Sequence, residues 1–211
     1  MPAISYKQVN RSAVVFLLLS LGLALGMTLA FVTPEHLEQK TIEQQTIEWL
    51  DKPRRLVNFS LESEAGAFDK QSLMGHWTIV FFGFLHCPDI CPTSLSQLAT
   101  LAASLAEKPI DKKVAFVFVS VDPERDSLVE ISQYVRHFHS SILAVTGSEE
   151  QLTQFAKRLG IQFKVSSDNE DYTVAHSITF SIIDPEGVFR GRFSPGFDVS
   201  SLVRNFTSKL D

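Results

Sequence analysis

The pattern of apolar and polar residues separates a short amino-terminal segment from the rest of the chain. Residues 13–32 read AVVFLLLSLGLALGMTLAFV and carry no charge. About 20 apolar residues are what a membrane-spanning helix needs. Lys7 and Arg11 precede this run and acidic residues follow it, which predicts a cytoplasmic amino end and an exported remainder. We therefore expect residues 1–12 in the cytoplasm and residues 13–32 as a single-pass signal anchor in the inner membrane, with the carboxyl-terminal domain on the periplasmic side.

Cleavage of this run as a signal peptide stays an alternative, because a small-residue site ends at Ala30. The apolar region of a cleaved signal is shorter, however, at about 7–15 residues. Residues 33–52 are polar and acidic and predict a linker, which leaves residues 53–211 as one folded domain.

Within this domain, continuous apolar runs predict buried strands, and apolar residues at helical spacing predict helices. We expect strands at 55–61, 77–85, 114–121, 142–145, 177–183 and 188–193, a turn at 62–68, one helical turn at 69–74, and helices at 94–105, 127–137, 148–159 and 200–210. Strands that alternate with helices and then end in an antiparallel hairpin predict an α/β, thioredoxin-like domain with a central mixed sheet flanked by helices.

The composition and charge of the chain argue against one class of partner, nucleic acid. The chain is 45% hydrophobic and 20% charged, which is an ordinary globular balance. Its formal net charge of −5 argues against a nucleic-acid partner, which would call for a basic stripe.

The only two cysteines, Cys87 and Cys91, lie in the stretch FFGFLHCPDICPT between a predicted strand and a predicted helix. Residues four apart on a helix lie about 5–6 Å from one another, which suits either a disulfide or two thiolates on one metal ion. A fixed disulfide across so short a loop would add little stability. The spacing is not the Cys-x-x-Cys of redox thioredoxins, and the neighbouring Pro88 and Pro92 favour a stiffer, metal-holding turn. We expect both sulfurs to be accessible at the end of the sheet.

Of six histidines, one is a candidate ligand. His36 lies in the predicted linker and is expected to be solvated, and His76 follows a predicted turn. His137 and His139 lie near the end of a predicted helix, which is a favourable position for histidine. His86 adjoins Cys87 and is expected to point away from it, where it could still tune the pKa of that thiol. His176 precedes the predicted strand 177–183, and if this strand is antiparallel to 77–85, His176 lies near both cysteines. Two thiolates and an imidazole suit Cu(I) or Cu(II), whereas zinc usually takes a fourth ligand.

A charged loop, Asp122-Pro-Glu-Arg-Asp126, follows the second buried strand at the same edge of the sheet. Helix capping by Asp126 with a local ion pair would explain it, and support of the neighbouring site is the alternative.

Three separated segments together resemble the Sco/SenC family of copper-binding cytochrome c oxidase assembly proteins. They are FFGFLHCPDICPTSL (81–95), VFVSVDPERDS (117–127) and DYTVAHS (171–177), and the likeness continues through IIDPEG to cover about residues 53–211. The resemblance implies a thioredoxin-like fold, copper bound by Cys87, Cys91 and His176, and a copper-receiving subunit of cytochrome c oxidase as partner. Ala175 departs from the family pattern, in which many members carry an aspartate before the histidine.

The resemblance also implies a second class of function. Cys87 and Cys91 would then be a redox-active, catalytic pair that keeps the cysteines of the oxidase copper site reduced. Because a metallochaperone and a thiol–disulfide oxidoreductase use the same two sulfurs, the sequence does not choose between them.

Overall fold

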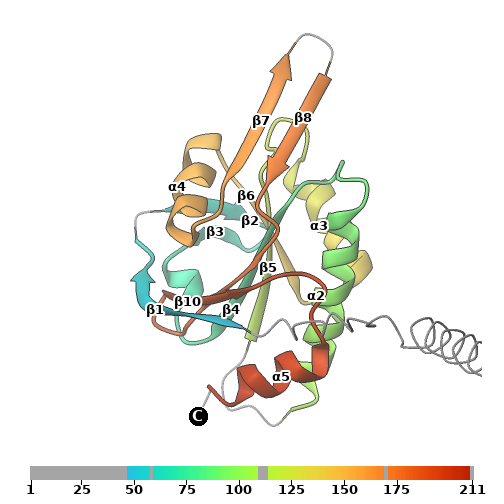
Figure 1. The fold of residues 1–211 in the computed structure, drawn as a ribbon. Helices are drawn as coiled ribbons and strands as arrows, with labels where there is room; N and C mark the ends of the chain where they lie inside the picture. Colours follow the sequence, from blue (N-terminus) through green and yellow to red (C-terminus); the bar gives the residue numbers. More distant parts are fainter. Residues whose placement is uncertain (1–46, 58, 109–113, 169–170, 210–211) are drawn as a thin grey trace, which may run out of the picture. The chain divides into compact units, whose positions relative to one another are not determined.

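A computed structural model describes residues 47–57, 59–108, 114–168 and 171–209 (Figure 1). The predicted cytoplasmic end, the predicted anchor at 13–32 and most of the predicted linker lie outside these residues. Within the described ranges, no helix is both long and apolar enough to cross a membrane.

Strands and helices alternate along the middle of the chain, as expected. The elements are β1 (Glu48–Arg55), β2 (Ser60–Ser63), β3 (Gly66–Asp69), the 3-10 turn η1 (Gln71–Leu73), β4 (Trp77–Gly83), α2 (Ile90–Ala106), β5 (Val114–Ser120), α3 (Leu128–Phe138), β6 (Ile142–Thr146), α4 (Glu149–Leu159), β7 (Phe163–Asp168), β8 (Asp171–His176), β9 (Phe180–Ile183), β10 (Val188–Phe193) and α5 (Val199–Thr207). Eight strands form one sheet in the order β1-β10-β9-β4-β5-β6-β2-β3. β4, β5 and β6 are parallel, and β9 is antiparallel to β4, so the predicted mixed sheet is confirmed.

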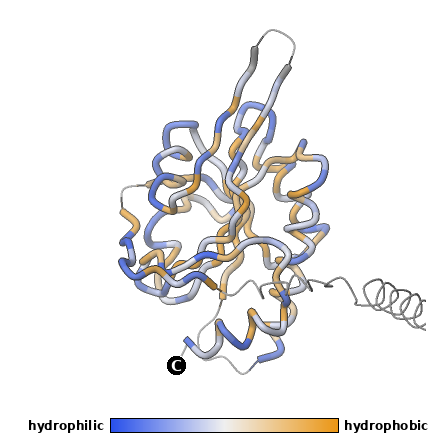
Figure 2. The backbone as a smooth tube through the Cα atoms, viewed as in Figure 1, coloured by the Kyte–Doolittle hydropathy of each residue, from blue (hydrophilic) through white to orange (hydrophobic). Residues whose placement is uncertain are grey.

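The central strands are mostly apolar because both faces of the sheet are covered. Along β4, Ile79 and Phe81 enter one core with residues of α2, α3 and α5, whereas Val80 and Phe82 enter a second core with residues of α4. Complete burial of such a side chain contributes about 1.5–3 kcal/mol. In Figure 2, hydrophobic residues lie mainly along the central strands of the sheet.

Two parts of the sheet edge differ from the prediction. Strand β1 begins at Glu48 and pairs with β10, so residues 48–52 lie in the sheet rather than in the expected linker. Its sequence, EWLDKPRR, is mostly polar because an edge strand is largely exposed, and the apolar pattern therefore does not reveal it. The segment 62–68, expected as a turn, contributes to a hairpin of β2 and β3.

The largest difference is the hairpin of β7 and β8, which the sequence pattern did not predict. Its two strands pair with each other and form a separate two-stranded sheet that projects from the domain (Figure 1). Charged and hydroxyl side chains alternate with few apolar ones, so neither strand has the apolar run that marks a buried strand.

Candidate metal centre

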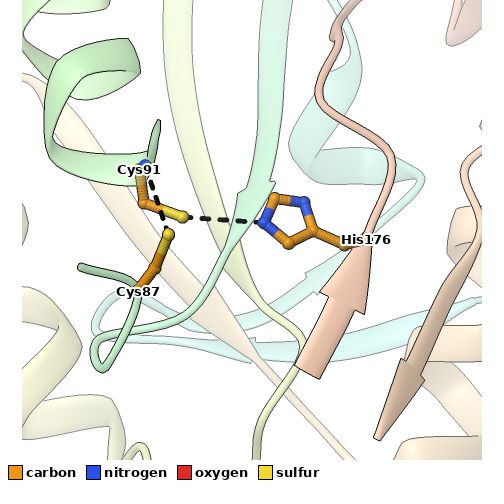
Figure 3. A group of neighbouring side chains, drawn as sticks. All are labelled: Cys87, Cys91 and His176. Atoms are coloured by element: carbon orange, nitrogen blue, oxygen red, sulfur yellow. Dashed lines mark hydrogen bonds between the residues drawn. The ribbon is translucent and has the colours of Figure 1, made fainter. Parts of the chain in front are cut away.

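Three side chains from separate parts of the fold converge at the carboxyl end of β4. Cys87 lies in the turn after β4, Cys91 in the first turn of α2, and His176 at the end of β8. One donor atom from each lies within 4.8 Å of the other two (Figure 3). Cys91 Sγ is 3.6 Å from His176 Nε2, and the Cys91 backbone N–H donates to Cys87 Sγ at 3.4 Å. The convergence expected from the antiparallel pairing of β9 with β4 is therefore present.

The end of β4 leaves room for these sulfurs through Gly83. A Cβ atom at this position would lie 3.1 Å from Cys91 Sγ and 2.6 Å from the ring of Phe118. Any larger residue would push against both groups, so the absence of a side chain lets the cysteine sulfur approach the strand.

Both sulfurs are less accessible than the sequence predicted. Cys91 is 0% exposed and Cys87 is 8% exposed. Helix α2 begins at Ile90, earlier than the predicted helix at 94–105, and this places the Cys91 side chain in the core beneath the helix. The residue that precedes the first turn of the helix is Asp89.

The hydrogen bonds of His176 prepare one ring nitrogen to act as a ligand. Nδ1 lies 3.0 Å from the carbonyl oxygen of Ser177, and because a carbonyl only accepts, Nδ1 carries the proton. The lone pair of Nε2 is then directed towards Cys91 Sγ. The rings of Phe81 and Phe84 contact the imidazole edge to face and help to fix its plane.

Burial shifts the pKa values of Cys91 and His176. It raises the pKa of Cys91, an effect that the hydrogen bond and the charge of neighbouring Cys87 increase. It also lowers the pKa of His176, which favours the neutral imidazole. A metal ion bound here would therefore displace a proton from Cys91 and meet an imidazole that is already neutral.

The remaining histidines of the described ranges do not join this group. His86 is 60% exposed, and its Nδ1 lies 3.7 Å from a carboxylate oxygen of Asp126. His137 and His139 contact the Gln133 carbonyl and the Ser141 hydroxyl, both at 2.7 Å. His86 therefore does not share a ligand set with Cys87, as expected, and its predicted influence on the pKa of that thiol stays a prediction.

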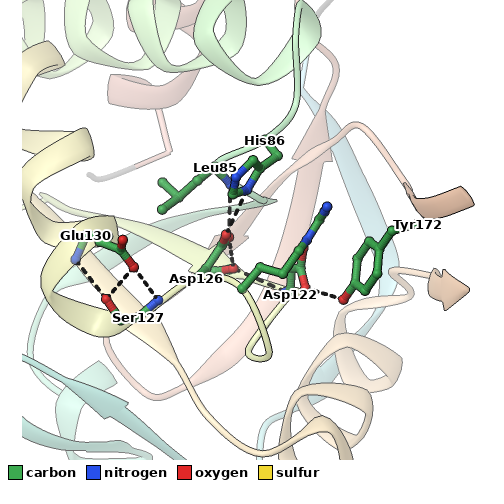
Figure 4. A network of polar contacts seen from close by, with 9 residues as sticks. Leu85, His86, Asp122, Asp126, Ser127, Glu130 and Tyr172 are labelled. Carbon is green, nitrogen blue, oxygen red and sulfur yellow. Dashed lines mark hydrogen bonds and ion pairs between the residues drawn. The ribbon is translucent and has the colours of Figure 1, made fainter. Parts of the chain in front are cut away.

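The charged loop after β5 supports the cysteine turn through Asp126 (Figure 4). Its Oδ2 accepts hydrogen bonds from the Leu85 backbone N–H at 2.9 Å and from Ser120 Oγ at 2.6 Å. Burial raises the pKa of Asp126. The expected capping by Asp126 is wrong, because Ser127 caps α3 in a reciprocal pair with Glu130.

Asp122 in the same loop makes the local ion pair that was expected, with Arg125 at 2.6 Å. It also accepts a 2.6 Å hydrogen bond from the hydroxyl of Tyr172 on β8, a contact that sequence reasoning missed. The available signal was the alternation of Tyr172 and His176 within DYTVAHS, since residues four apart in a strand share a face.

Comparison with known proteins gives a consistent match. A family model described as SCO1/SenC matches residues 50–211. The SCO1 homolog 1 of Arabidopsis thaliana mitochondria is 40% identical over 155 residues, which is 72% of this chain and 46% of that protein. A SCO2-like protein of Rickettsia prowazekii is 31% identical over 197 residues, covering 92% of this chain and 93% of that protein.

Solved structures agree with the sequence matches. The crystal structure of Arabidopsis thaliana ScoI with copper bound has a TM-score of 0.65 and 36% identity, and the match covers 72% of this chain and 95% of that structure. The present chain spans about half the length of the Arabidopsis and bovine curated relatives, at 46% and 53%.

Proposed function

This chain belongs to the SCO1/SenC family, and we propose that it is a copper-binding metallochaperone for assembly of the copper centre of cytochrome c oxidase. Copper is its cargo, held by Cys87, Cys91 and His176 and passed to the copper-receiving subunit of the oxidase. Residues 13–32 would anchor it in the inner membrane with the folded domain on the periplasmic side.

The convergence of two thiols and one imidazole within 4.8 Å carries this proposal. Thiolate sulfur is a soft donor that suits Cu(I), and imidazole nitrogen is a donor that Cu(II) accepts readily. Structural zinc sites usually take four protein ligands, and no fourth cysteine, histidine or carboxylate joins the group in the described ranges. The copper bound in the solved Arabidopsis relative supports the same choice of metal.

A thiol–disulfide oxidoreductase is the second candidate, favoured by two free cysteines with adjacent sulfurs. The Cys87 thiolate, on the more exposed residue, would attack one sulfur of a partner disulfide, form a mixed disulfide with it and release the other partner sulfur as a thiolate. Cys91 would then attack Cys87 Sγ, release the second partner thiol and leave a Cys87–Cys91 disulfide, so that two electrons pass to the partner. This reaction makes no use of His176, whose free ring nitrogen faces the sulfurs, and we therefore favour copper handling.

Replacement of His176 separates the two candidates. In His176→Ala, Cu(II) binding should weaken strongly because two sulfurs do not complete the tetragonal N/O-rich environment that Cu(II) prefers. Cu(I) should be retained better, since two thiolates satisfy a soft ion, and exchange with a disulfide peptide should largely survive. His137→Ala, which removes an exposed imidazole outside the group, is the matched control.

The deciding assay is oxidase assembly in cells starved of copper. Under our proposal the His176→Ala variant fails to support assembly although the purified protein still exchanges disulfides. If the variant supports assembly as well as the wild type and His137→Ala do, copper transfer is not the main role, and the oxidoreductase takes its place.

A further inference from the structure

The hairpin that carries His176 forms its own two-stranded sheet, separate from the eight-stranded one. β7 and β8 pair only with each other and not with the eight-stranded sheet. At the base of the hairpin, the Ser177 N–H donates to the Gln162 carbonyl at 2.8 Å, and Ser177 Oγ accepts from the Gln162 N–H at 3.1 Å. Beyond this base, side chains must hold the hairpin against the body of the domain.

One face of β8 supplies these side chains. Tyr172, Val174 and His176 alternate along the strand and therefore share a face. Val174 packs against both hydrophobic cores, and His176 lies beside Cys91. Tyr172, four residues from the imidazole, makes the outermost described contact of this face with the domain, through its hydroxyl to Asp122 Oδ1 at 2.6 Å.

The partner of Tyr172 is held firmly. Asp122 is 0% exposed, and its second oxygen, Oδ2, is bound by the Arg125 guanidinium at 2.6 Å. The same guanidinium lies over the Tyr172 ring, with Arg125 Cζ 3.7 Å from the ring centroid. Desolvation and the hydrogen bond to Asp122 raise the pKa of Tyr172 to about 12, so its hydroxyl stays a donor. Tyr172 is thus held at its hydroxyl by Asp122, as Figure 4 shows, and across its ring by the Arg125 guanidinium.

The loop at residues 122–126, which contacts Tyr172, also contacts the turn that carries Cys87. Asp126, four residues after Asp122, accepts from the backbone N–H of Leu85, two residues before Cys87. A single short loop therefore contacts both parts of the candidate metal centre, the sulfur-bearing turn through Asp126 and the imidazole-bearing hairpin through Asp122.

We propose that Tyr172 is a positioning residue, which together with Asp122 and Arg125 fixes the place of His176 relative to the two sulfurs. The inference rests on the proposed function and adds a determinant of metal preference to it. When the contacts of Tyr172 with Asp122 and Arg125 are lost, the hairpin becomes more mobile. The imidazole of His176 then spends less time beside the two sulfurs. Because Cu(II) depends on the nitrogen donor while Cu(I) is satisfied by two thiolates, the loss falls mainly on Cu(II).

The test uses Tyr172→Phe, which keeps the ring over Arg125 and removes only the hydroxyl. A hydrogen bond to an ionised group is worth roughly a factor of ten or more in an equilibrium constant. We expect the Kd for Cu(II) to rise about tenfold, while the Kd for Cu(I) changes less than about threefold. Hydrogen exchange across residues 163–176 should become faster. Arg125→Lys, which loses the planar stack, should shift both measurements in the same direction.

The matched control is Glu64→Gln, which removes the charge from another 2.6 Å side-chain contact, the ion pair of Glu64 in the β2–β3 turn with Arg136 on α3. It should leave both copper affinities unchanged. A second control is Tyr172→Phe in the His176→Ala background, where the hydroxyl has no imidazole left to position. There the additional change in Cu(II) affinity should disappear.

Purified full-length protein is reduced and titrated with Cu(II) and, separately, with Cu(I). A selective loss of Cu(II) affinity that vanishes in the His176→Ala background supports the inference. If wild type binds copper and Tyr172→Phe binds Cu(II) equally well, or loses the same factor without His176, the inference alone is overturned. If reduced wild type binds no copper, the proposed function itself fails and the inference falls with it.

Discussion

A methyl group added at Gly83 would test how closely the candidate centre is packed. The Cβ of Gly83→Ala would lie 2.6 and 3.0 Å from two ring atoms of Phe118 and 3.1 Å from Cys91 Sγ. Phe118 is completely buried, so its ring has little room to move. Gly83 does not have a positive φ, so the substitution is limited by space and not by backbone conformation.

The expected magnitude follows from these contacts. Overpacking of a filled core costs about 1–3 kcal/mol, and loss of glycine flexibility in the unfolded chain returns about 0.4–1 kcal/mol. The free energy of unfolding should therefore fall by about 1–2 kcal/mol, which lowers Tm by roughly 2–8 °C in a chain of this size. Displacement of Cys91 Sγ should also weaken copper binding by about ten- to a hundredfold, the usual effect of disturbing the surroundings of a metal ligand.

A matched variant separates the two effects. Gly147→Ala would place a Cβ 2.8 Å from a methyl carbon of Leu61, a comparable clash in the other hydrophobic core. Urea unfolding and competitive copper titration of both variants should show similar losses of stability but a loss of copper affinity only in Gly83→Ala. Equal copper affinities in the two variants would refute the claim that Gly83 makes room for a ligand sulfur.

Three further predictions follow from the site and the chain. Oxidation of Cys87 and Cys91 to a disulfide should abolish uptake of one copper per protein, measured by metal analysis after gel filtration, and equal retention in both forms would contradict the ligand set. Because burial raises the pKa of Asp126 above its usual 3.8, the folded state holds this proton more tightly than the unfolded state, and the free energy of unfolding should decrease as pH rises through the raised pKa. Asp126→Asn should remove this decrease in urea unfolding as the pH rises above the usual pKa of the carboxyl group, and an unchanged pH profile would show that Asp126 does not titrate in this way. Replacement of residues 13–32 by a cleavable signal should yield a soluble, folded, copper-binding protein, and failure of the exported part to fold would place the domain boundary elsewhere.

The interior of the sheet could be predicted from the sequence because burial on both faces leaves a continuous apolar run. β4 and β5 were expected at 77–85 and 114–121, and they occupy Trp77–Gly83 and Val114–Ser120. Helix α4 was equally predictable: it was expected at 148–159 and occupies Glu149–Leu159, and Gly160 ends it in the left-handed conformation. Strands exposed at an edge or in a projecting hairpin, such as β1 and β7, leave no such pattern.

The candidate site was predictable in its residues but not in its environment. The antiparallel order of β4 and β9 was enough to bring His176 towards Cys87 and Cys91. The burial of Cys91 depends on where α2 begins, which differs by four residues from the apolar pattern at 94–105. The contact of Tyr172 with Asp122 joins residues fifty positions apart, and it depends on a hairpin that has no apolar signature.

The ligand set is tested most directly by X-ray absorption spectroscopy at the copper edge on protein that is reduced and then loaded with Cu(II). Ligation by Cys87, Cys91 and His176 predicts two sulfur donors at about 2.3 Å and at least one imidazole nitrogen at about 2.0 Å, by analogy with the metal–ligand distances of thiolate and imidazole sites. In His176→Ala the imidazole contribution should be lost while both sulfurs remain. A copper site with fewer than two sulfurs in wild type, or an imidazole signal that persists without His176, would contradict the assignment of Cys87, Cys91 and His176 as the copper ligands.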